Sequence, residues 1–240
     1  MPLPLKIILV VWVLLLVVVV LVVVHTLRRR RRGRGAIETR GWTRLPEATG
    51  LVSGWVGWPF VTSYEPGRAS DAVVGELQGC RFMAFTWHYR RPDGDTAKGE
   101  LERCSVVALA TEQSYPRLKV VKGWRGFGRG PEQRGLPDVE LGDPQLDRTW
   151  EVRGDEQFAR ALLTPEVLEV VDRVGESLSV QPGWVVRVVT PWAFFAGEDR
   201  MVEELQKLAA PFRAVPAETW AAYGGAPRFV GVLGHLPQDG

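Results

Sequence analysis

Side chains that could act as nucleophiles or acid–base catalysts are few in this 240-residue chain. It contains two cysteines, Cys80 and Cys104, and three histidines, of which only His88 falls in a strongly patterned segment. Cys104 and His88 form the only thiol–imidazole pair that the strand pattern could bring together, and no further group orients the imidazole. No metal-ligand spacing of Cys or His and no Gly-x-Ser-x-Gly sequence is present.

Three pairs of adjacent carboxylates are candidates for acid–base chemistry. Asp155-Glu156 and Glu198-Asp199 are expected at helix starts, where the helix dipole favours negative charge. Glu203-Glu204 is expected on the solvated surface of a helix. Carboxylate catalysis therefore stays an open alternative, but no arrangement of catalytic residues in the sequence supports it.

Glycine- and tryptophan-rich segments are the candidates for a ligand site. The Gly123–Gly142 segment is expected to be a loop, and its glycines lack the Lys-Ser/Thr and the following helix of a phosphate-binding loop. Trp55 and Trp58, close together in a Gly-rich stretch, could line a ligand or partner surface, although most tryptophans are expected in the core. We therefore assign no catalytic, cofactor-binding or metal-binding residue and favour a non-enzymatic role.

Strands and helices are predicted in blocks along the chain. Met83, Phe85, Trp87 and Tyr89 alternate with a second set of residues, which predicts a half-buried strand over 79–91. A turn at 92–95 and a returning strand over 101–110 complete a hairpin that pairs Cys104 with a residue near 87. Further strands are expected over 60–64, 72–77, 117–122 and 149–153, with 117–122 continuing the meander. The stretch 40–57 is expected to be irregular.

Helix signals are concentrated in the second half. Thr164 is a suitable N-cap, Pro165 a suitable first residue, and Gly175 a suitable stop. Other helices are expected over 155–163, over 198–210 with Pro211 closing it, and over 217–223, where Trp220 packs inward. A second hairpin is expected over 178–190. The fold class predicted is α+β: a transmembrane helix, then a domain of mostly antiparallel strands with about three short amphipathic helices.

The N-terminal segment predicts a membrane anchor. Residues 7–24 are all apolar, and eighteen helical residues span roughly 27 Å at ~1.5 Å each, against a bilayer core of about 30 Å. Arginines that follow this run predict an outside N-terminus and a cytoplasmic domain, and they argue against a cleaved signal peptide. They are expected to contact the bilayer and its anionic lipid headgroups: Arg28, Arg29, Arg30, Arg31, Arg32 and Arg34.

Charge is distributed unevenly. The chain has a net charge of +2, but Lys6 and the six arginines account for seven of its thirty basic residues. The remainder carries 23 basic and 28 acidic residues, a net charge of −5. An acidic domain does not favour nucleic-acid binding. In a cytoplasmic setting both cysteines would stay reduced.

Two segments resemble an uncharacterised family of actinobacterial single-pass membrane-anchored proteins. Residues 75–89 match a pattern G-x3-G-x2-F-x-A-F-x-aromatic-x-Tyr. Residues 150–165 match F-x-V-x2-D-x3-A-x2-L-L-T-P, with Trp150 in place of the usual Phe. The resemblance covers about residues 40–223 and implies the anchor and a soluble domain of this size, but no activity.

The domain organisation predicted is a tail and transmembrane helix (1–27), a basic linker (28–40), an α+β domain (41–223) and a flexible tail (224–240). The preferred function is a non-enzymatic protein-interaction module at the inner face of the plasma membrane, with an unidentified protein partner. Two alternatives stay open: an enzyme that uses carboxylates or residues of the 123–142 loop, and an envelope-associated or anionic-lipid sensor.

Overall fold

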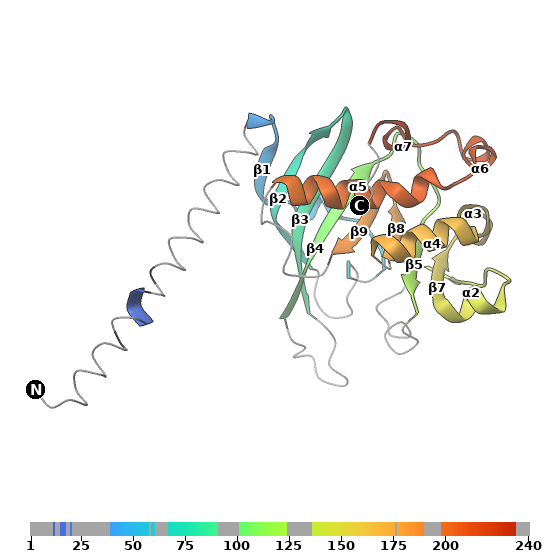
Figure 1. The fold of residues 1–240 in the computed structure, drawn as a ribbon, viewed down its shortest axis with the longest axis horizontal. Helices are drawn as coiled ribbons and strands as arrows, with labels where there is room; N and C mark the ends of the chain where they lie inside the picture. Colours follow the sequence, from blue (N-terminus) through green and yellow to red (C-terminus); the bar gives the residue numbers. More distant parts are fainter. Residues whose placement is uncertain are drawn as a thin grey trace, which may run out of the picture.

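The computed structural model describes residues 12, 15–17, 20, 39–57, 59–60, 67–90, 101–123, 136–175, 177–189 and 198–233. Its centre is one antiparallel sheet of nine strands, in the order β1-β2-β3-β4-β9-β8-β5-β7-β6 (Figure 1). The strands are β1 (Thr43–Glu47), β2 (Arg68–Leu77), β3 (Cys80–Arg90), β4 (Leu101–Ala110), β5 (Leu118–Lys122), β6 (Asp138–Val139), β7 (Trp150–Gly154), β8 (Ser177–Gln181) and β9 (Trp184–Val189).

Six α-helices and one 3-10 helix accompany the sheet in the part of the chain that the structure describes. They are η1 (Thr49–Val52), α2 (Pro144–Thr149), α3 (Glu156–Leu162), α4 (Pro165–Val174), α5 (Glu198–Arg213), α6 (Ala217–Ala222) and α7 (Phe229–Val232). Figure 1 shows α4 and α5 lying across one face of the sheet.

Side-chain alternation along the strands divides the buried residues between two cores. Phe82 and Ala84 of β3 contribute to the larger core, on the face that α3 to α7 cover. Met83, Phe85 and Trp87 contribute to the smaller core on the opposite face, beneath the segment from Ala48 to Phe60. The alternation predicted a half-buried strand, whereas β3 has buried residues on both faces, because the sheet is the middle layer of the domain.

The first hairpin and several helix boundaries confirm their predictions. β3 pairs with β4, and Cys104 lies opposite Trp87. Thr164 accepts a hydrogen bond from the Val167 N–H at the start of α4, and Gly175 caps its end. The predicted hairpin over 178–190 is β8 paired with β9. Trp220 is buried in α6.

Other predictions are wrong, and long-range pairing explains the main one. β5 does not continue the meander: it lies between β8 and β7, while β4 pairs with β9. The stretch 40–57 contains β1 and η1 instead of being irregular. Pro211 lies inside α5, which runs on to Arg213. The core extends beyond 223, because Phe229 and Leu233 are buried.

The predicted fold class is wrong in its transmembrane helix, and the single-pass membrane assignment is corrected with it. Among the residues that the structure describes, no helix is both long and apolar enough to cross a membrane. The longest, α5, has 16 residues and carries charged side chains along its length, whereas a span takes about 20 mostly apolar residues. Apart from Trp12, 15–17 and Val20, the apolar run 7–24 lies outside the described residues.

Candidate functional site

Of the two tryptophans predicted to line a ligand surface, Trp55 and Trp58, the structure describes only Trp55. Trp55 is only 5% exposed and packs in the smaller core, with its ring centroid 5.0 Å from that of Phe60, 6.0 Å from Phe85 and 6.5 Å from Trp184. Its surroundings are those of a core residue. Trp58, most of the loop over 123–142, and the arginines 28–32 and 34 lie outside the described residues.

The segment around Trp55 is fixed by a polar side chain from the sheet. Gln181 of β8 is buried and donates from Nε2 to the Val56 carbonyl (2.9 Å) and to Ser179 Oγ (2.8 Å). Its Oε1 accepts the Val56 N–H at 3.1 Å. Gln181 therefore pairs with both backbone groups of Val56 as a neighbouring strand would, and holds this segment against the sheet.

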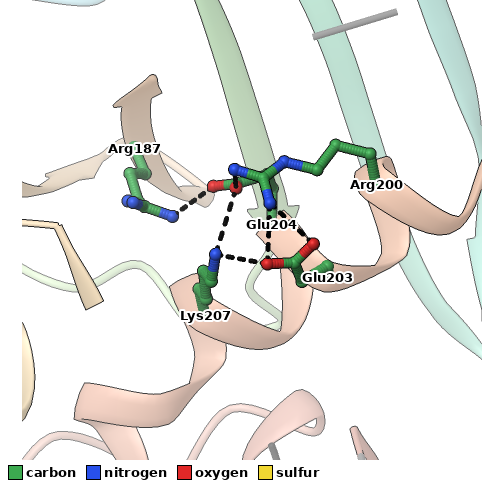
Figure 2. Close-up of polar contacts among 5 residues, drawn as sticks. All are labelled: Arg187, Arg200, Glu203, Glu204 and Lys207. Carbon is green, nitrogen blue, oxygen red and sulfur yellow. Dashed lines mark hydrogen bonds and ion pairs between the residues drawn. The ribbon is translucent and has the colours of Figure 1, made fainter. Parts of the chain in front are cut away.

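The most concentrated chemistry in the described structure is a cluster of five charged residues between α5 and β9 (Figure 2). Glu204 is at its centre and is 1% exposed. Its carboxylate pairs with Arg187, with Arg200 Nη2 at 2.9 Å and with Lys207 Nζ at 3.4 Å. Glu203 accepts two hydrogen bonds from Arg200 Nη1, at 2.8 and 2.7 Å, and also pairs with Lys207. Three cations thus surround two carboxylates.

Arg187 enters this cluster from the sheet and is 8% exposed. It lies on the helix-covered face of β9, between Val185 and Val189, which both belong to the larger core. The guanidinium also packs against Gly175 at the end of α4: a Cβ at that glycine would lie 2.8 Å from Arg187 Cζ. A cation at the C-terminal end of a helix meets the negative end of its dipole. Arg187 therefore connects α4, α5 and β9.

Hydrogen bonds within the cluster favour the ionised form of Glu203. Hydrogen bonds from Lys207, and secondarily from Arg200, lower the pKa of Glu203 against a smaller opposing effect of burial. Burial lowers the pKa of Arg187, and Glu204 opposes that shift by charge and hydrogen bonding. A guanidinium stays protonated at any pH at which proteins fold. The cluster therefore holds α4 and α5 to β9 through ion pairs and the contact of Arg187 with Gly175.

The sequence contains a signal for this cluster in the positions of its charged residues. Glu204 follows Met201 by three residues and precedes Leu208 by four, so it falls on the apolar stripe of α5. Arg187 occupies an inward position of a strand whose alternate residues are apolar. Opposite charges at core positions of two neighbouring elements indicate a buried ion pair. The prediction that the Glu203-Glu204 pair is solvated surface is wrong for Glu204.

The thiol–imidazole pair considered from the sequence is not formed. Cys104 lies opposite Trp87 and shares its face of the sheet, so His88 projects from the other face. His88 Nε2 instead forms a hydrogen bond with Ser70 Oγ at 2.9 Å. Burial raises the pKa of the Cys104 thiol to about 12, so it is not a nucleophile at neutral pH.

Within the described ranges, no group of three or more His, Cys, Asp or Glu side chains is arranged to hold a metal ion. Asp155 is an N-cap, accepting from the Phe158 N–H at 2.8 Å, as its place at a helix start predicted. Cys80 is buried in the larger core and Cys104 in the smaller one, so the two thiols lie on opposite faces of the sheet.

Comparison with known proteins adds one likeness. No family model and no curated protein matches the chain. A solved structure shares its fold. It is the crystal structure of the mycobacterial trehalose monomycolate transport factor A, TtfA, which aligns with a TM-score of 0.50 at 14% sequence identity. The alignment covers 78% of this chain and 95% of that chain. At this identity the likeness establishes a common fold.

Proposed function

We propose that this protein is a non-enzymatic factor of the cell envelope that supports the transport of an envelope lipid by binding another protein. The observation that carries the proposal is the alignment with TtfA, a mycobacterial transport factor, over nearly the whole of that chain. An origin in the actinobacterial family suggested by the two sequence segments is part of the same proposal.

The chemistry of the described residues supports a binding role over a catalytic one. Glu204, the most buried carboxylate, is neutralised by three cations. Glu203 is held by Arg200 and Lys207. A general base needs a carboxylate that can accept a substrate proton, and both of these are committed to ion pairs.

Deletion of the gene in its source organism, followed by metabolic labelling of envelope lipids, tests the proposal. A transport factor leaves total lipid synthesis unchanged, while the labelled lipid reaches the outer envelope less and its precursor accumulates inside. Wild-type protein restores the distribution. Glu203→Gln, which changes a carboxylate that is only partly buried, serves as the matched control and restores it equally.

Two outcomes contradict the proposal. A fall in total synthesis of the lipid indicates an enzyme in its formation. An unchanged distribution removes the transport role. The protein-binding part is tested separately, by cross-linking in cells that produce a tagged chain, with an unrelated tagged envelope protein of similar abundance as the control. Failure to recover a reproducible partner counts against that part.

A further inference from the structure

We draw no further inference here: the strongest candidate, the indole N–H of Trp220 in α6, which is buried beside the rings of Tyr115 and Phe212 without a hydrogen-bond partner in the described part of the chain, carries nothing because nothing among the described residues shows what would accept its hydrogen bond.

Discussion

Glu203 and Glu204 are adjacent in α5 but differ in environment, since neighbouring residues on a helix point about 100° apart. Glu204 is fully buried, whereas Glu203 is 38% exposed. We expect Glu204→Gln to lower the free energy of unfolding by about 3 kcal/mol, because it leaves the buried Arg187 without its counter-ion. Glu203→Gln, the matched control, costs less than about 1 kcal/mol. Denaturant titration measures both, and equal losses contradict the assignment.

Replacing both members of the buried pair, Arg187 and Glu204, is expected not to lower the stability of the fold. Arg187→Met combined with Glu204→Leu removes the two desolvated charges together, and such replacements are often neutral or stabilising by about 1–4 kcal/mol. We therefore expect the double variant to be more stable than Glu204→Gln in the same denaturant titration. A double variant that is less stable than Glu204→Gln shows that the remaining cations, Arg200 and Lys207, need this carboxylate.

Glu47 provides a pH dependence at the edge of the sheet. Hydrogen bonds from the Thr49 hydroxyl and N–H, and then from Arg68, lower its pKa from 4.5 to about 2. Because the folded pKa is the lower one, this carboxylate stabilises the fold above about pH 4.5, and the contribution is lost as the pH falls toward 2. We expect the stability difference between wild type and Glu47→Gln to shrink over this interval. A difference independent of pH contradicts this.

Gly175 is the residue on which the junction of α4 and β9 depends. Its φ is 140°, and a Cβ there would overlap the Arg187 guanidinium. We expect Gly175→Ala to cost about 1–3 kcal/mol from the backbone alone and more from displacing Arg187. Gly183→Ala, at φ 73° with open space around it, carries only the conformational cost. Thermal unfolding compares them, and we expect the cost of Gly175→Ala to be smaller in the Arg187→Met and Glu204→Leu background, where no guanidinium is displaced.

Local elements were predictable where a short-range rule determined them. The turn predicted over 92–95 indicated the register that pairs Cys104 with Trp87, and side-chain capping placed the start of α4 at Thr164. The strand order was not predictable, because β5 lies between β8 and β7, and no local pattern encodes which distant strands pair. Pro211 failed as a stop signal because Phe212 and Val215, both buried beyond it, keep the chain packed on the core.

The charged cluster was also only partly predictable, because it combines a local pattern with a long-range contact. Glu204 and Arg187 were visible in the sequence as charges at core positions of an apolar pattern, but only the tertiary structure brings their elements together. The placement of Arg68 opposite His88 depends on the β2–β3 register, which contains an irregularity between Ser70 and Val73 that no turn or propensity rule predicts. A one-residue difference in register would place Arg68 on the opposite face from His88.

At the scale of the whole molecule, the pairing of β4 with β9 joins the two halves of the chain. β1 to β4 precede β5 in sequence, yet β9 adds to β4 and connects the first four strands to β8, β5, β7 and β6. β9 also contributes to both cores, through Val185 on one face and Val186 on the other. The two cores therefore share a backbone and cannot lose their structure independently.

This continuity predicts one cooperative unfolding transition. Phe85→Ala in the smaller core should cost about 3–5 kcal/mol and Leu205→Ala in the larger core about 2–5 kcal/mol, and each should lower the midpoint seen by every probe. Tryptophan fluorescence reports on both cores, through Trp55 in the smaller one and Trp42, Trp150 and Trp220 in the larger one, and far-ultraviolet circular dichroism reports on all helices and strands. If Phe85→Ala divides the fluorescence curve into two steps and lowers the midpoint of only one of them, the cores are separate units. Coincident curves in both variants indicate that the nine strands fold as one body.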